Sequence, residues 1–184
     1  MVSVWAGRPS LRATAPSEVR DTARMNDPEV PSYTESIRID APRERVWALV
    51  TAMERYGEWS SENTGGYWRK GADGQPGTGR VGDQFVGINR RDGAEWKAPV
   101  EIVERDEERA FGFVTGGRDM DLARWRYELQ DADGATLLTE EWQLRNRAYF
   151  MELGGEEEIA RRAANARESI GATLRGMKTT AEGT

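Results

Sequence analysis

The sequence predicts an α+β fold in which a curved antiparallel sheet of about six to seven strands wraps around a long C-terminal helix. Three observations support this architecture. A strand-like segment runs directly into a helical one near residue 40, segments with apolar residues at every second position fill residues 67–146, and an amphipathic helical segment ends the chain. Strands that are apolar on one face only are typical of antiparallel sheets.

The first predicted elements are a strand and a helix within residues 36–59. Ile37 and Ile39 alternate with polar residues, and an Asp-Ala-Pro turn at 40–42 leads into apolar residues at helical spacing. Pro42 suits the first turn of a helix, where its missing N–H costs nothing, and Asp40 is a suitable N-cap. The turn at 56–59 closes this helix and is expected to direct Trp59 toward the mouth of a cavity.

The middle of the chain predicts an antiparallel meander. Two Asp-Gly pairs, at 92–93 and 133–134, are strong signals for two-residue hairpins. The glycine-rich run 77–82 matches Gly-x-Gly-x-x-Gly, but it follows a Gly/Asp/Pro loop and enters a strand, whereas a dinucleotide site needs the motif to open a helix. We therefore predict a hairpin loop over 71–82, with a lid role left open. The expected strands cover 67–70, 80–90, 95–105, 110–115, 122–130 and 136–146.

The last predicted element is an amphipathic helix over residues 156–178. Three glutamates at 156–158 suit the positive end of a helix dipole, and Arg175 and Lys178 suit the other end. Its apolar stripe is rich in alanine, and this slim stripe leaves room for a cavity between helix and sheet. Arg161, Arg162 and Arg167 lie off the stripe and are interpreted as a solvated face. The stripe comprises Ile159, Ala163, Ala166, Ile170, Leu174 and Met177.

Composition excludes several classes of function. The chain contains no histidine and no cysteine, which removes the Ser-His-Asp triad, thiolate chemistry and nearly all zinc sites. No cofactor and no metal are expected, with an all-oxygen Ca²⁺ or Mg²⁺ site left open. The net charge of −6 argues against a nucleic-acid partner. No apolar run approaches the ~20 residues of a membrane span, so no integral membrane segment is expected, and a cytoplasmic location is the default.

Several short motifs carry a resemblance to a known family. The sequence resembles the START-like superfamily (SRPBCC), in particular its polyketide cyclase/dehydrase and lipid-transport branch, over residues 33–178. The resemblance implies a helix-grip fold that binds apolar or aromatic ligands between sheet and C-terminal helix, and some members cyclise or dehydrate polyketides. The residues that carry it are Ile37, Ile39, Ala41-Pro42, Val46-Trp47, the pair Tyr56 and Trp59, Gly82-Asp83 before Phe85, the pair Phe111 and Phe113, Thr139-Glu140 and Trp142.

The resemblance also divides the chain into two parts. Residues 33–180 are expected to form the START-like ligand-binding domain. Residues 1–32 contain four prolines and few apolar residues, which predicts a disordered or loosely attached arm, with a partner-binding arm as the alternative.

The candidate ligand-binding residues are mostly aromatic and lie on the predicted inner faces of strands. Such residues form either a packed core or the wall of an apolar cavity. Glu140 alternates inward, where a carboxyl tends to have a raised pKa and could act as acid/base, ligand anchor or ion-pair member. Asp83 is a weaker acid/base candidate, and the Tyr127 hydroxyl could reach a ligand carbonyl. The set comprises Trp59, Phe85, Trp96, Phe111, Phe113, Trp125, Tyr127, Glu140 and Trp142.

Three functions are consistent with these features. The first is non-catalytic binding of a small hydrophobic or aromatic ligand, lipid or polyketide-like. The second is a cyclase or dehydratase of a polyketide-like substrate that uses a cavity carboxylate, with Glu140 as the main candidate. The third is a protein-interaction or stress-related module.

Overall fold

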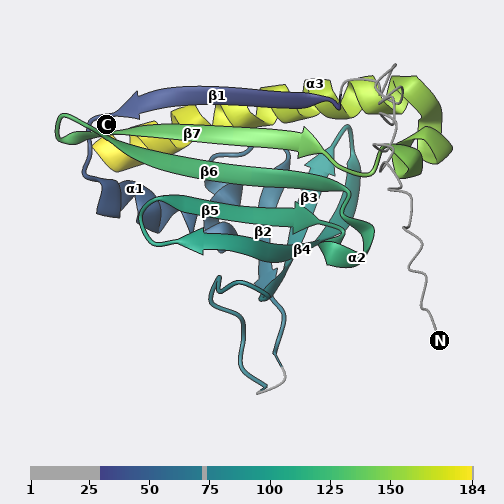
Figure 1. The fold of residues 1–184 in the computed structure, drawn as a ribbon, viewed down its shortest axis with the longest axis horizontal. Coiled ribbons are helices and arrows are strands. Elements are labelled where there is room, and N and C mark those ends of the chain that lie inside the picture. Colours follow the sequence, from purple (N-terminus) through teal and green to yellow (C-terminus); the bar gives the residue numbers. More distant parts are fainter. Residues whose placement is uncertain (1–29, 72–73, 184) are drawn as a thin grey trace, which may run out of the picture.

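Seven antiparallel strands form one sheet in the computed structural model, which describes residues 30–71 and 74–183 (Figure 1). The spatial order is β1-β7-β6-β5-β4-β3-β2, so the chain begins at one edge and then crosses to the other before returning strand by strand. The predicted fold class is confirmed. The strands are β1 (Ser32–Ile39), β2 (Asn63–Trp68), β3 (Gln84–Arg91), β4 (Ala94–Asp106), β5 (Ala110–Thr115), β6 (Ala123–Ala132) and β7 (Ala135–Leu144).

Both predicted Asp-Gly hairpins are confirmed. The φ angles are 52° and 81° at Asp92 and Gly93, and 55° and 80° at Asp133 and Gly134. Two successive residues with positive φ match the twist of the flanking strands, which is why Asp-Gly pairs favour such turns. Strand β1 begins at Ser32. Of the arm expected over 1–32, residues 1–29 lie outside the described part of the chain.

Two short helices connect β1 to β2: α1 (Arg43–Val50) and the 3-10 helix η1 (Met53–Glu58). The prediction that Asp40 caps α1 is wrong. Pro42 occupies the N-cap position with φ −66° and ψ 149°, so Asp40 lies two residues too early to reach the free N–H groups of the first turn. The Asp40 carboxylate instead lies 3.4 Å from the Arg38 guanidinium, and the backbone N–H of Asp40 donates to Glu182 Oε1 at 2.8 Å.

The C-terminal helix α3 (Arg147–Glu182) is longer than predicted and contains a kink. Gly154 and Gly155 have non-helical backbone angles, and Gly155 has φ 67° and ψ −155°. The predicted helix over 156–178 is confirmed as the part after the kink. A preceding segment, 147–153, is capped by Asn146, whose Oδ1 accepts from Tyr149 N at 3.0 Å.

The apolar stripe of α3 packs on the concave face of the sheet, behind β1 and β7 in Figure 1. Ile170, Leu174 and Met177 are fully buried there. The helix approaches closely because Gly176 lacks a side chain: a Cβ at Gly176 would lie 2.9 Å from Trp59 Cβ. None of the helices within 30–71 and 74–183 is both long enough and apolar enough to cross a membrane.

Strand register arranges the concave face into rows of side chains. Directly paired residues of antiparallel strands point to the same face, so one row crosses three strands as Trp142, Trp125 and Phe113. The neighbouring row comprises Glu140, Tyr127 and Phe111, with Glu35 of β1 paired to Glu140. These two rows place six of the nine candidate residues next to one another on the concave face.

The glycine-rich loop connects β2 to β3 and opens no helix, as predicted. Asp83 Oδ2 accepts from the backbone N–H groups of Thr78 and Arg80, at 2.7 and 3.0 Å. The Asp83 carboxylate therefore shapes this loop and is not available as an acid/base group in a cavity. Among the described residues of the loop, the carbonyl groups of Thr78 and Gly79 accept hydrogen bonds from Arg105, and none of these residues lines the cavity described below.

Candidate ligand-binding cavity

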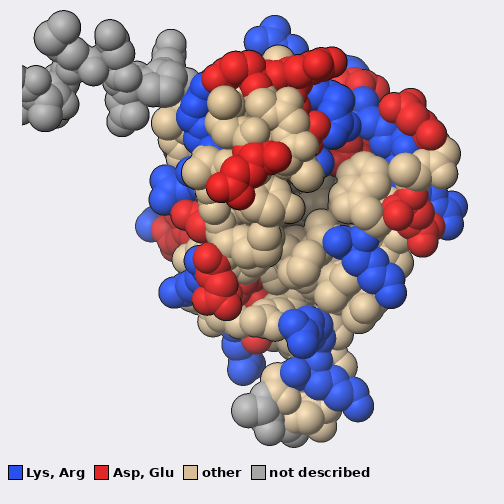
Figure 2. All heavy atoms as spheres, turned by 90° about the vertical axis from the view of Figure 1, so that its right-hand side faces the viewer, with Lys and Arg blue, Asp and Glu red and all other residues tan. Residues whose placement is uncertain are grey.

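An apolar cavity lies between the concave face of the sheet and α3, and it consists of two adjoining chambers. The outer chamber has a volume of about 320 Å³ and the inner one about 110 Å³. Figure 2 shows a hollow among uncharged atoms on the corresponding face, with acidic and basic side chains around it. The residues that line both chambers, and so join them, are Glu62, Asn89, Ala98, Thr115, Trp125 and Ser169.

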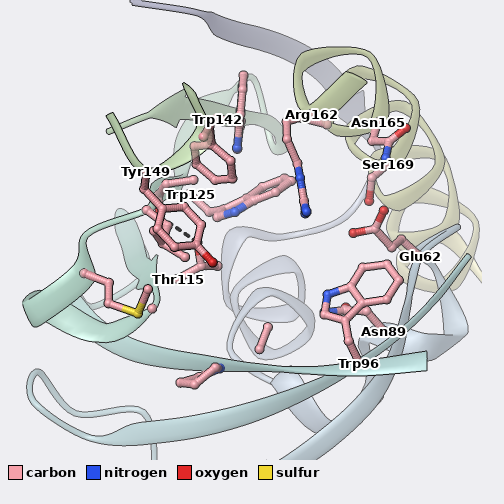
Figure 3. A pocket seen from close by; sticks show the side chains of 18 of the residues that line it. Glu62, Asn89, Trp96, Thr115, Trp125, Trp142, Tyr149, Arg162, Asn165 and Ser169 are labelled. Carbon is pink, nitrogen blue, oxygen red and sulfur yellow. Dashed lines mark hydrogen bonds between the residues drawn. The ribbon is translucent and has the colours of Figure 1, made fainter. Parts of the chain in front are cut away.

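Aromatic side chains form the wall of the outer chamber. Trp125 meets Trp142 edge-on at a centroid distance of 6.5 Å. Trp125 also stacks on Phe113 of the inner chamber, with an interplanar angle of 15° and a centroid distance of 6.4 Å. Trp96 of β4 lies opposite this cluster, and Tyr149 of α3 lies beside it (Figure 3). Such flat apolar surfaces with a few polar groups are typical of sites for small molecules.

Polar groups of α3 and the η1–β2 loop surround the opening. The Arg162 side chain extends from α3 into the opening, and Glu62 lies next to Ser169 of α3 (Figure 3). The Arg162 guanidinium is fixed by a 2.7 Å hydrogen bond from Nε to Glu158 Oε1, and it lies 5.6 Å from the centre of the Phe150 ring. The interpretation of Arg162 as part of a solvated face is therefore wrong, because the kink brings Phe150 under it.

Glu140 lines the inner chamber. Its side chain is nearly inaccessible, with 2% of the residue exposed, and Oε1 accepts a 2.9 Å hydrogen bond from the Tyr127 hydroxyl. Oε2 has no hydrogen-bond partner among the described residues. Burial raises the pKa of Glu140 to about 8. The hydrogen bond from Tyr127 lowers this pKa by a smaller amount, and the negative charge of Glu35 raises it slightly. At neutral pH the carboxyl is therefore mostly protonated.

Hydroxyl and amide groups around Glu140 are already paired. The Tyr56 hydroxyl donates to Val50 O at 2.6 Å, and its ring meets the Tyr127 ring edge-on at 6.2 Å. Asn63 Nδ2 donates to Asn89 Oδ1 at 3.1 Å. Burial raises the pKa of both tyrosines, so both hydroxyls stay neutral. Glu140 is thus distinguished by an oxygen that no neighbouring protein group satisfies.

The structure brings six of the nine predicted site residues to the cavity. Trp96, Trp125 and Trp142 line the outer chamber, while Phe85, Phe113, Trp125 and Glu140 line the inner one. Tyr127 contributes only through its hydrogen bond to Glu140.

Trp59 and Phe111 lie outside both chambers. Trp59 does not turn toward the mouth: it is 6% exposed, packs on Gly176, and donates from Nε1 to Thr180 Oγ1 at 2.9 Å. Phe111 is fully buried and meets the ring of Trp47 edge-on at 6.1 Å. Phe111 faces inward as alternation along β5 predicts, but it packs against Trp47 of α1, whereas Trp59 packs against α3.

Several lining residues were missed because they are polar. Asn89 lies on the same face of β3 as Phe85, and Thr115 continues the inward face of β5 after Phe113. The same period of two would have found both residues. Ser169 and Thr173 lie four residues apart on the inward stripe of α3, where polar side chains within an apolar pattern are a signal for a ligand-binding wall.

Comparisons with known proteins agree with this geometry. A polyketide-cyclase-like protein of Corynebacterium glutamicum, solved by NMR in solution, is 27% identical with a TM-score of 0.59, covering 83% of this chain and 92% of that one. The di-domain ARO/CYC BexL from the BE-7585A biosynthetic pathway is 22% identical with a TM-score of 0.62, covering 85% of this chain and 52% of that one. Ara h 8.0201 is 12% identical with a TM-score of 0.59, covering 84% and 99%.

The second and third of these likenesses show the fold alone. A search of curated proteins found no match. The family model described as polyketide cyclase / dehydrase and lipid transport matches residues 30–182, which is most of the chain. The chain therefore belongs to the polyketide cyclase/dehydrase and lipid transport family.

Proposed function

We propose that this protein binds a small hydrophobic or aromatic molecule, lipid or polyketide-like, in the two-chamber cavity and holds it without catalysis. The observation that carries the proposal is the cavity itself, which is walled by Trp96, Trp125 and Trp142 and extends inward to Glu140. Burial of a planar ligand against these rings removes apolar surface from water on both partners, which is the main favourable term in binding.

The pairing of the polar wall supports binding over turnover. Ser60 and Ser169, the serines of the inner chamber, lie 3.2 Å from each other, and neither contacts a base among the described residues. A nucleophile needs a base within hydrogen-bond reach, which the serine pair lacks. The polar wall is thus arranged to orient a ligand.

Blocking the junction of the chambers tests the proposal. Ala98 lines both chambers, so Ala98→Phe places a ring where they meet. Ala164→Phe adds the same ring at an exposed position of α3 and is the matched control. Titration with 2-ethylnaphthalene, followed by calorimetry, is expected to show binding by the wild type and the control, with a loss of about tenfold or more in Ala98→Phe.

Two results would contradict this function. Binding that is equal in all three proteins would place the ligand outside the cavity. Absence of binding by the wild type, for this probe and for a long-chain fatty alcohol, would remove the proposal.

A second candidate is a cyclase or dehydratase in which Glu140 is the acid/base group. It is favoured by the buried Glu140 carboxyl, whose pKa of about 8 lies near neutral pH, where proton transfer in both directions is efficient. Incubation with a linear poly-β-ketone thioester and mass analysis of the cyclised products tests it. Non-catalytic binding predicts the same products with wild type and Glu140→Gln, whereas the enzyme predicts that the replacement removes a product that wild type forms.

A further inference from the structure

The carboxyl of Glu140 has one satisfied oxygen and one unsatisfied oxygen, and this asymmetry points to the chemistry of the ligand. Tyr127 donates to Oε1, so Oε1 acts as the acceptor. The proton of the neutral acid therefore resides on Oε2, which has no hydrogen-bond partner among the described residues although it is buried. A buried donor without an acceptor is unfavourable, so a ligand that supplies an acceptor gains affinity on binding.

Glu140 is kept uncharged by burial, which outweighs the opposing effect of the hydrogen bond from Tyr127. The groups that face it are the Tyr127 hydroxyl from β6, Glu35 from β1, and Tyr56 from η1, whose hydroxyl is engaged by Val50 O. The inward residues of α3 in this chamber, Ser169 and Thr173, do not titrate. Arg175 of α3 approaches Gly171 together with Glu35, and it forms no hydrogen bond or ion pair with Glu140.

The size of the inner chamber limits what can reach Glu140. Its volume is about 110 Å³, and an apolar cavity of about 150 Å³ is known to bind benzene. The chamber therefore has room for no more than one ring, and the remainder of a larger ligand occupies the outer chamber among Trp96, Trp125 and Trp142. The oxygen that meets Glu140 must then lie on the leading ring.

We infer that the inner chamber receives a leading ring whose uncharged carbonyl oxygen accepts a hydrogen bond from Glu140 Oε2, and that the chamber rejects a leading carboxylate. This inference rests on the proposed binding function and specifies its ligand class. A carboxylate in this chamber would lose its hydration and find no basic group among the lining residues. It would also repel Glu140 whenever Glu140 loses its proton.

Three probes of similar shape test the inference: 2-acetylnaphthalene, 2-ethylnaphthalene and 2-naphthoate. With wild-type protein near pH 6, we expect the ketone to bind about two- to tenfold more tightly than the hydrocarbon, and the carboxylate at least about tenfold more weakly. Near pH 10, where Glu140 ionises, the preference for the ketone over the hydrocarbon should vanish.

Two substitutions assign the preference to Glu140. Glu140→Gln retains an N–H donor in place of the O–H, so it should keep the preference for the ketone and lose its dependence on pH. Glu140→Met has no donor, so it should bind ketone and hydrocarbon equally. Circular dichroism on each variant verifies the fold, and calorimetry gives the dissociation constants.

The outcomes separate this inference from the function on which it rests. If wild type binds ketone and hydrocarbon equally, or if Glu140→Met keeps the preference, the role of Glu140 is overturned while ligand binding stands. If wild type binds neither neutral probe, both the function and the inference are overturned.

Discussion

Burial of Glu140 raises the pKa of its carboxyl from 4.5 to about 8, so between these values the folded protein binds a proton that the unfolded chain has released. Stability then decreases with pH through this window: the contribution is fully present below about pH 4.5 and is lost as pH rises toward 8. Between these pH values we expect the free energy of unfolding of the wild type to fall by on the order of a few kcal/mol because of this group, and that of Glu140→Gln to show no such fall. Urea unfolding at several pH values measures the difference.

The difference between the two proteins isolates this carboxyl. Hydrogen bonds from Arg126 and Lys178 lower the pKa of Glu128 and Glu182, respectively. The stability that these two carboxylates contribute to the folded protein is therefore lost as the pH falls. If the free energy of unfolding changes with pH equally in wild type and Glu140→Gln, Glu140 is ionised in the folded protein.

Phe111 and Trp96 are both predicted aromatic site residues, but the structure gives them different roles. Phe111 is fully buried outside the chambers, so Phe111→Ala should cost about 3–5 kcal/mol of stability. Trp96 is half-buried at the cavity wall, so Trp96→Ala should lower stability by less than about 1 kcal/mol and weaken binding of 2-ethylnaphthalene about tenfold.

Denaturant unfolding and calorimetry on the two variants test this separation. A strongly destabilised Trp96→Ala that still binds normally would reverse the assignment of core and wall.

At this scale the sequence indicates which side chains face inward but not which of them border empty space. Alternation along β7 places Glu140 and Trp142 on the concave face, and both prove to be there. The hydrogen bond from Tyr127 depends on the register of β6 against β7, which pairs residues 127 and 140 through a hairpin. Alternation within one strand shows which face a residue points to, but not which residue of the next strand lies opposite it.

Among the elements, the kink in α3 most directly shapes the cavity. Gly155 has φ 67° and ψ −155°, a conformation that is essentially restricted to glycine. It turns the segment 147–153 so that Tyr149 and Phe150 line the outer chamber. We expect Gly155→Ala to lower stability by roughly 1–3 kcal/mol and, because the helix straightens, to weaken binding of 2-ethylnaphthalene several-fold.

Gly134→Ala is the matched control for this substitution. Gly134 also has a positive φ, 80°, and an added Cβ would meet nothing within 4 Å at either glycine. The control lies in the β6–β7 hairpin, so it should lose stability but keep its affinity, as measured by denaturant unfolding and calorimetry. Normal affinity in Gly155→Ala would show that the kink does not shape the binding site.

Elements with a local signature were predictable, and those set by packing were not. The Asp-Gly hairpins and the helix over 156–178 carry their own turn residues and periodicity. The segment 147–153 has a short and mostly exposed face that yields no clear period, and it becomes part of the wall only through contacts such as that of Phe150 with Arg162. A pattern that spans only two turns is too short to specify where a helix packs.

For the whole molecule, a ligand in the cavity joins the sheet to α3 and should stabilise the fold as a unit. At a concentration of about 100 times Kd, binding to the folded state alone contributes about 2.7 kcal/mol, and a chain of this size gains roughly 2–4 °C in Tm per kcal/mol. We expect calorimetric scans with 2-ethylnaphthalene to show this rise for wild type and for Ala164→Phe, but not for Ala98→Phe. An equal rise in all three would indicate binding elsewhere.

The sequence by itself determined the fold class, the two hairpins, the inward faces of the strands and the absence of histidine and cysteine chemistry, because these depend on composition and on local periodicity. Only the tertiary structure decided that Trp59 packs under α3 while Arg162 reaches the opening, and that Glu140 keeps one oxygen free. The physical reason is that a cavity forms where two packed surfaces leave a space between them. Its position depends on strand register, on the kink at Gly155 and on the close approach at Gly176, which join residues far apart in the chain.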